Sequence, residues 1–251
     1  MKQYFLVCCC CCIVLTGCSR KKTEKEAESL YRQAISAIGS HKYDDAKSLV
    51  RRSIDIDSDT KRDSALAEDY LFLGNLFEQT GQYDSVSPSM QQAISLAHAI
   101  GDKNIERRAK LVLAGFFLEM HQYQEAAVNV SDAATLSGWL EDWDSAFLAN
   151  EIVRSARHNM GRYAEEEQIL DTLDHINLLW LNRTKEPALF QARFELLQSW
   201  IRRDEAGMFY NGWKQTALSR GDTISLIRAY IEYGDMRQSL HQLDSALQAY
   251  T

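Results

Sequence analysis

Hydrophobic and small residues return along this chain at a fixed interval of 40 residues. A turn-like segment marks the interval, and its anchor positions are 43, 83, 123, 163, 203 and 243. Nine residues before the anchor, the chain carries Ala34, Gly74, Ala114, Arg154, Phe194 and Gly234. Three residues after it, the chain carries Ala46, Val86, Ala126, Glu166, Ala206 and Ala246. Seven and ten residues after it come mostly apolar positions, from Val50 and Ser53 to Leu170 and Leu173. Such spacings keep side chains on one face of a helix, whereas a strand alternates its faces.

Each interval therefore predicts two helices joined by a short break, and no segment has the alternation of a strand. Residues that end helices are expected at the break, namely Gly39, Gly81 and Gly161, with histidine at 41, 121 and 241. Asp-Ser or Asp-Asp pairs near the anchor are expected to cap the next helix. Pro88 falls in an expected first helical turn, and Pro187 is expected to mark a connector between units.

A period of this length is typical of solenoids, in which each unit packs on its neighbours. The pattern resembles the tetratricopeptide repeat, and the second unit carries it best. The matching residues there are Leu73, Gly74, Phe77, Gly81, Gln82, Tyr83, Met90 and Ala93. The resemblance implies an all-α fold, an α-solenoid of about six helix-turn-helix repeats over residues 27–251 with one continuous core. The family period is about 34 residues, so longer helices or connectors are expected here.

The first residues of the chain are expected to direct it to the cell envelope. Residues 1–17 carry Lys2 and a short apolar stretch, which is typical of a secretory signal and too short to span a bilayer. Leu15-Thr16-Gly17-Cys18 resembles the bacterial lipobox. That resemblance implies cleavage before Cys18, lipidation of Cys18 and, with Ser19 following it, outer-membrane delivery facing the periplasm. Residues 18–26 are expected to form a tether. A plain secretory signal or an uncleaved anchor is the alternative.

Composition narrows the chemistry further. All six cysteines lie at positions 8–12 and 18, so the folded part has no thiol for a disulfide, a metal site or catalysis. The formal net charge is −7, which disfavours nucleic acid as a partner because phosphate contacts need clustered basic residues. No phosphate loop or hydrolase motif occurs, so we expect no enzyme, no cofactor and no metal site. Histidines at equivalent positions, 41, 121 and 241, are separated by at least a whole repeat and cannot meet at one ion.

A binding surface is implied by the family resemblance. In tetratricopeptide solenoids, the first helix of each pair lines the groove, at positions 12, 8 and 5 residues before the anchor. The candidate partner-binding residues are Tyr31, Ile35, Leu71, Asn75, Glu78, Leu111 and Leu118. Polar positions continue the groove at Glu151, Ser155, His158, Gln191, Glu195 and Asp235. Exposed apolar residues in a groove usually mark a binding site. The alternative is that the longer unit packs them under an adjacent connector.

Two positions of the fourth unit break the pattern of small residues. Arg154 and Glu166 stand where other units carry small or apolar side chains that face each other across the helix pair. Because a lone buried charge is costly and a pair is tolerable, we expect an ion pair between them. At the other end of the chain, Leu243, Ala246, Leu247 and Tyr250 are expected to be partly uncovered, because the last pair is expected to be truncated.

These expectations favour a lipid-anchored scaffold that binds a protein or peptide partner, with membrane attachment through Cys18. The alternative is the sensory half of a signalling regulator whose output domain lies beyond residue 251.

Overall fold

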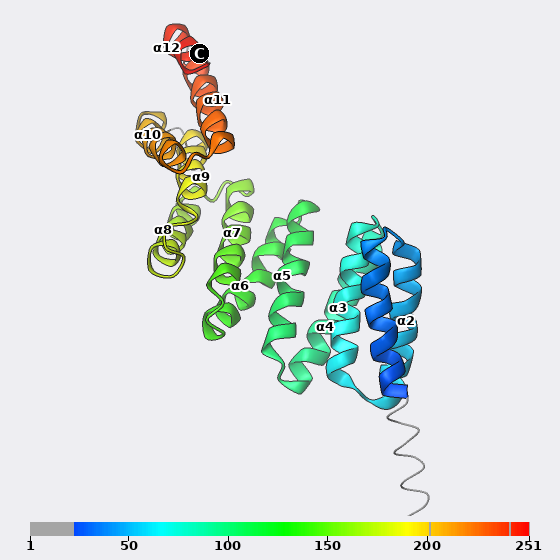
Figure 1. Cartoon of the computed structure of the whole chain (residues 1–251). Coiled ribbons are helices and arrows are strands. Elements are labelled where there is room, and N and C mark those ends of the chain that lie inside the picture. Colours follow the sequence, from blue (N-terminus) through cyan, green and yellow to red (C-terminus); the bar gives the residue numbers. More distant parts are fainter. Residues whose placement is uncertain (1–22, 201, 241, 251) are drawn as a thin grey trace, which may run out of the picture. The chain divides into compact units, whose positions relative to one another are not determined.

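A computed structural model describes residues 23–200, 202–240 and 242–250, and no strand occurs in these ranges (Figure 1). The first helix covers residues 23–39. It is followed by α2 (Tyr43–Thr60), α3 (Asp63–Gln79), the 3-10 turn η1 (Tyr83–Ser85), α4 (Val86–Ile100), α5 (Lys103–Glu119), α6 (Tyr123–Trp139), α7 (Trp143–Asn159), α8 (Tyr163–Leu179), α9 (Glu186–Ser199), α10 (Arg203–Arg220), α11 (Thr223–Ser239) and α12 (Leu243–Tyr250). The expected all-α repeat architecture of helix pairs is confirmed.

The chain divides into two compact units between Phe116 and Phe117, near the end of α5. We call the part up to Phe116 the first unit and the part from Phe117 the second unit. The expectation of one continuous core over residues 27–251 stays a prediction. In repeat proteins each helix pair packs only on its neighbours, so a chain can divide into compact parts along its length.

Residues with a left-handed backbone conformation recur about every 20 residues, and this spacing accounts for the 40-residue period. The residues with positive φ are His41, Lys61, Gly81, Gly101, His121, Glu141, Gly161, Asn182, Arg183 and Gly221. Most helices between them span 17 residues. Both helices of a pair are therefore long, and the connectors are short. Gly39 was expected to end a helix, but it is helical, and His41 takes the left-handed position instead.

Replacing glycine by alanine should change the free energy of unfolding in opposite directions at a left-handed position and inside a helix. Gly161 has φ +69°, a conformation that is strained for a residue with a β carbon. Gly161→Ala should lower the free energy of unfolding by about 1 kcal/mol. Gly115 lies inside α5, and a β carbon there would meet no atom within 4 Å. Gly115→Ala should raise the free energy of unfolding by about 0.5–1 kcal/mol, because glycine is a poor helix former.

Urea unfolding of both variants measures these changes. Equal signs for the two substitutions would contradict the assigned backbone conformations.

Most helix N-caps differ from the expectation. The N-cap residues of α2 and α3, Lys42 and Arg62, precede the aspartates and make no side-chain cap hydrogen bond. Asp63 lies within the first turn of α3. Acidic residues of the first turn, such as Asp44 and Asp45 of α2, stabilise the positive end of the helix dipole instead.

Some aspartates do act as caps. Asp142 accepts a hydrogen bond from the backbone N–H of Ser145 at the start of α7. Asp222 does the same for Ser225 at the start of α11. Asp102 accepts from two backbone N–H groups at the start of α5. Capping therefore occurs where an aspartate directly precedes the helix.

The repeat positions form the core, as expected. At nine residues before the anchor, Ala34, Ala114 and Phe194 are fully buried. The other core positions, three, seven and ten residues after the anchor, are buried wherever they are described, and include Ala46, Val50, Val86, Met90, Ala126, Val130, Leu170, Leu173, Ala206 and Trp213. Gly74 lies close to the end of the Met90 side chain, and an added β carbon would lie 2.7 Å from Cε of Met90, so that side chain would have to shift. The interior is therefore built from the same spacing that the sequence repeats.

The structure differs from the sequence expectation at three places. The first helix begins at residue 23, inside the segment 18–26 that was expected to be a tether. Pro187 lies in the first turn of α9, where a missing N–H leaves no helical bond unmade, and does not mark a connector. In α12, Leu247 is 64% exposed whereas Ala246 is 4% exposed, so the expected uncovered surface is present at only one of these two positions.

Candidate functional site

First helices of neighbouring pairs contact each other in the first unit. Arg108 of α5 forms an ion pair with Glu68 of α3, at 2.6 Å between Nη1 and Oε1. Tyr31 of the first helix packs against Phe72 of α3, with ring centroids 5.1 Å apart. These residues are about one repeat apart in the sequence. The first helices of the first unit therefore form a common face.

The second unit repeats this arrangement. His158 of α7 lies 3.5 Å from the hydroxyl of Ser199 on α9, between Nε2 and Oγ. Arg228 of α11 donates to Gln191 of α9 at 3.3 Å. The first helices α7, α9 and α11 thus also present a common face, on which most residues are polar. We call the face made by the first helices of either unit the inner-helix face.

The candidate groove residues separate into two groups. Leu71 and Leu111 are core residues, 1% and 9% exposed, so the expectation that they line a groove is wrong. The equivalent position is half-buried at Tyr31 and exposed at Ile231, so its burial is specific to the second and third helix pairs. Tyr31, Asn75, Glu78 and Leu118 are half-buried, and Ile35 is exposed. Leu118 belongs to the second unit and the others to the first. Cys18 lies outside the described residues.

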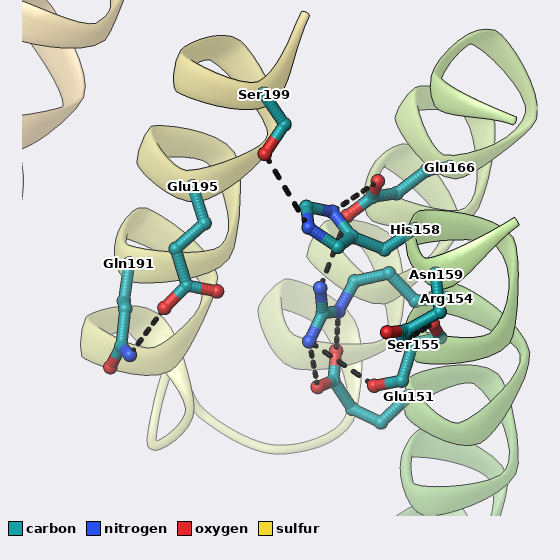
Figure 2. A network of polar contacts seen from close by, with 9 residues as sticks. All are labelled: Glu151, Arg154, Ser155, His158, Asn159, Glu166, Gln191, Glu195 and Ser199. Carbon is teal, nitrogen blue, oxygen red and sulfur yellow. Dashed lines mark hydrogen bonds and ion pairs between the residues drawn. The ribbon is translucent and has the colours of Figure 1, made fainter. Parts of the chain in front are cut away.

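The ion pair expected in the fourth helix pair is confirmed. Arg154 Nη1 lies 3.1 Å from Glu166 Oε1, and Glu166 is fully buried (Figure 2). Arg154 also contacts Glu151 of its own helix, at 3.1 Å. The arginine therefore joins a partly exposed carboxylate at the face to a carboxylate inside the core. Because both Glu166 oxygens are engaged, its burial is compensated.

A third member of this network was not recognised in the sequence. His158 Nδ1 lies 2.9 Å from Glu166 Oε2, so the carboxylate bridges an arginine and a histidine (Figure 2). The hydrogen bond to Glu166 raises the pKa of His158, against the opposing effect of burial. Two basic residues one helical turn apart, both ahead of a glutamate at a normally small position, were the signal that could have revealed it.

The raised pKa of His158 makes a pH-dependent contribution to stability. The folded pKa lies above the unfolded value, so the stabilisation is fully present below about pH 6.5 and is lost as the pH rises through the folded pKa. The difference in unfolding free energy between wild type and His158→Gln should therefore shrink as the pH rises. NMR titration should place the His158 pKa above about 6.5 in the wild type and lower in Glu166→Gln. An unchanged pKa in Glu166→Gln would refute the pairing.

The contacts from Ser199 to His158 and from His158 to Glu166 match the hydroxyl–imidazole–carboxylate chain of a hydrolase triad. The groups around Ser199 do not support catalysis, however. A triad needs free N–H groups beside the nucleophile to stabilise an oxyanion. Ser199 is the last residue of α9, where carbonyl groups point outward. The nearby N–H groups of Trp200 and Arg202 already donate to Leu196 and Leu197, each at 2.8 Å. We assign no catalytic residue in the described part of the chain.

Two further properties concern the described residues alone. No group of three or more His, Cys, Asp or Glu side chains there is placed to hold a metal ion. None of the helices described combines the length and the apolar character that crossing a membrane requires.

Solved structures place the fold among repeat proteins. A variant of the TPR-like repeats of a putative kinesin light chain from Podosopora anserina superposes with a TM-score of 0.67 at 14% identity, covering 80% of this chain and 98% of that chain. The apo form of RapI gives a TM-score of 0.69 at 11% identity, covering 90% and 95%. A Rap protein complexed with competence and sporulation factor gives 0.53 at 15% identity, covering 90% and 73%.

At these identities the similarity establishes the fold, a solenoid of TPR-like helix pairs. No protein-family model matches the chain, and no curated protein matches it.

Proposed function

We propose that this chain is a lipid-anchored scaffold of the cell envelope that binds a protein or peptide partner on its inner-helix face. The observation that carries the proposal is the repeated contact between first helices, as between Arg108 and Glu68 or between His158 and Ser199. Such contacts make an extended face from positions one repeat apart. Solenoids of helix pairs use extended faces of this kind to hold partners.

The second unit gives this face an acidic character. Glu232 is partly buried, and its pKa is raised by burial and by the carboxylates of Glu195 and Asp235. Burial is the largest cause of this pKa shift and the charge of Arg228 acts against it, and a cation from a partner would lower the remaining cost of ionising Glu232. A partner segment with basic side chains therefore fits this part of the inner-helix face.

A matched pair of variants tests the binding role. Ser155, Gln191 and Glu195 are half-buried positions of the inner-helix face, outside the buried core. Replacing all three by alanine should reduce partner recovery after in-cell crosslinking by about tenfold or more, as expected when the dissociation constant rises by at least about tenfold. The control replaces Gln168, Thr172 and His175, exposed residues of α8, by alanine. Equal recovery with both triple variants would refute the proposed face.

The membrane anchor is tested separately. Cys18 ends the segment that resembles a lipobox. Cys18→Ala should release the protein from the membrane fraction, and mass spectrometry of the wild type should find acyl chains on Cys18. Membrane retention of the variant, with an unmodified Cys18 in the wild type, would refute lipid anchoring and leave the binding face untouched.

The second candidate function is ligand sensing within a signalling regulator. The fold similarity to a Rap protein in complex with competence and sporulation factor favours it. In that case, ligand binding would bias an output domain encoded downstream of residue 251. The coding sequence beyond that residue distinguishes this function from the scaffold, because an output domain there is expected only for the regulator.

A further inference from the structure

A cavity of about 400 Å³ lies in the first unit between the first helix, α2, α3 and the beginning of α5. Its apolar wall is formed by Ala27, Tyr31 and Ala65. Acidic and basic side chains complete the lining. The volume lies in the range of cavities that hold small organic groups, roughly 300–1,000 Å³.

Two buried carboxylates in this cavity each have an oxygen without a hydrogen bond. Asp69 and Asp57 are each 2% exposed. Oδ2 of Asp69 and Oδ1 of Asp57 make no hydrogen bond to any group in the described part of the chain. Buried polar atoms are nearly always paired, because leaving one unpaired costs about 1–3 kcal/mol, and more when the group is charged. Oδ1 of Asp57 lies 3.4 Å from Nη1 of Arg62 in an ion pair, so Oδ2 of Asp69 is the acceptor that a bound group could satisfy.

The arginines of the cavity are already engaged. Arg62 donates to the carbonyl of Glu24 at 3.0 Å, and its ion pairs with Asp57 and Glu28 are each 3.4 Å long. Arg108 is held by Glu68 at 2.6 Å. Burial raises the pKa of Asp69 to about 7, and the neighbouring carboxylate of Asp57 adds to the shift, against the lowering effect of a hydrogen bond from Ser53. The charge of Asp69 is therefore poorly compensated by the protein itself.

We propose that this cavity binds an organic cation, a primary ammonium or guanidinium group on a short apolar stem, with Asp69 as its principal counter-charge. The donor hydrogens of such a group would satisfy Oδ2 of Asp69, beside the ion pair of Asp57 with Arg62. The stem would lie against Ala27 and Ala65, and the ring of Tyr31 offers a face that attracts cations. This assignment does not depend on the scaffold role, since a free amine and a basic side chain of a partner share the same chemistry.

A metal ion fits this site less well. Hard cations prefer six or more oxygen ligands, whereas this cavity combines one unpaired carboxylate oxygen, Oδ2 of Asp69, with an apolar wall and three lining arginines, Arg32, Arg62 and Arg108. An organic cation tolerates that setting because its stem buries apolar area while its head makes directed hydrogen bonds.

Calorimetric titration of the full chain at pH 8 tests the proposal with defined probes. Butylammonium and butylguanidinium should bind saturably, whereas butanol, which has a similar stem and no charge, should not. A blocked Gly-Lys-Gly peptide and its norleucine analogue form the second arm. Tighter binding of the lysine peptide than of butylammonium would identify a protein side chain as the source. The reverse order would identify a free amine, and either order supports the cation site.

Asp69→Asn should weaken binding of the cation probes by at least about tenfold, the factor that corresponds to about 1.4 kcal/mol. Asp63→Asn is the matched control, because Asp63 is an exposed carboxylate on the same helix and lies outside the cavity lining. It should bind the probes like the wild type. Thermal unfolding of both variants verifies that they are folded. Binding of butanol equal to that of the cations, unchanged binding by Asp69→Asn, or no saturable binding would overturn the proposal.

Discussion

Replacement of Glu166 by alanine is expected to lower the free energy of unfolding by about 3 kcal/mol, at the lower end of the range for breaking a buried ion pair. Glu166 is fully buried and accepts from both Arg154 and His158. Without it, both basic groups lose a partner in a site with little access to water. Arg154 retains Glu151, which is why the lower end of the range is expected. Urea unfolding at about pH 6, where His158 is protonated, measures the change.

Glu165 provides the control for that substitution. It precedes Glu166 in α8, is half exposed and forms ion pairs with Arg157 and Arg162. Exposed pairs contribute about 0–1 kcal/mol, so Glu165→Ala should have a small effect. A double-mutant cycle that combines Glu166→Ala with Arg154→Met should show strong coupling. A loss at Glu166 no larger than the loss at Glu165 would mean that the network does not form in solution.

Replacement of Asp69 by asparagine is expected to stabilise the protein by several kcal/mol at pH 8. The pKa of Asp69 is raised from 3.8 to about 7 in the folded protein. Because the folded pKa lies above the unfolded value, stability is lost as the pH rises from about 4 to about 7, where the unfolded chain ionises and the folded protein resists ionisation. About three pKa units correspond to roughly 4 kcal/mol, which is an upper value for this one group. Asparagine keeps the shape and has no charge to bury.

The pH profile distinguishes this cause from a general surface effect. The stability of the wild type should fall between about pH 4 and pH 7 relative to Asp69→Asn, and the two proteins should converge at the acid end. Asp59→Asn, at an exposed position of α2, should follow the wild type at every pH. A constant difference between wild type and Asp69→Asn across this window would show that Asp69 titrates normally.

The ion pair of the fourth helix pair could be predicted because the repeat itself supplied the geometry. Where other units place small or apolar residues opposite one another, two charges must face each other, so Arg154 and Glu166 stood out. His158 could not be recognised in this way, because its position on the first helix is polar in several units. That position does not indicate a buried carboxylate below it. The role of His158 depends on the depth to which Glu166 is buried.

The two buried carboxylates of the cavity could not be predicted in the same way. Asp57 and Asp69 interrupt no apolar stripe, and in the sequence they look like ordinary solvated residues of amphipathic helices. Their burial arises from packing of the first helix over α2 and α3, as where Oγ of Ser53 lies 3.3 Å from the carbonyl oxygen of Ala27. The burial of Leu71 and Leu111 could not be predicted from their repeat position either, because the equivalent Ile231 is 47% exposed. The 40-residue period predicts a longer unit, but it does not predict how the side chains of the added helical turns pack.

Binding on the inner-helix face is tested most directly by placing a photo-crosslinking amino acid at Ser155 of α7 and, separately, at Thr172 of α8, in the cell that carries the gene. Both positions lie in the second unit, but only Ser155 belongs to the inner-helix face. A crosslink to a distinct protein from Ser155, and none from Thr172, is the predicted result. A crosslink from Thr172 alone, or from neither position, would contradict partner binding on this face.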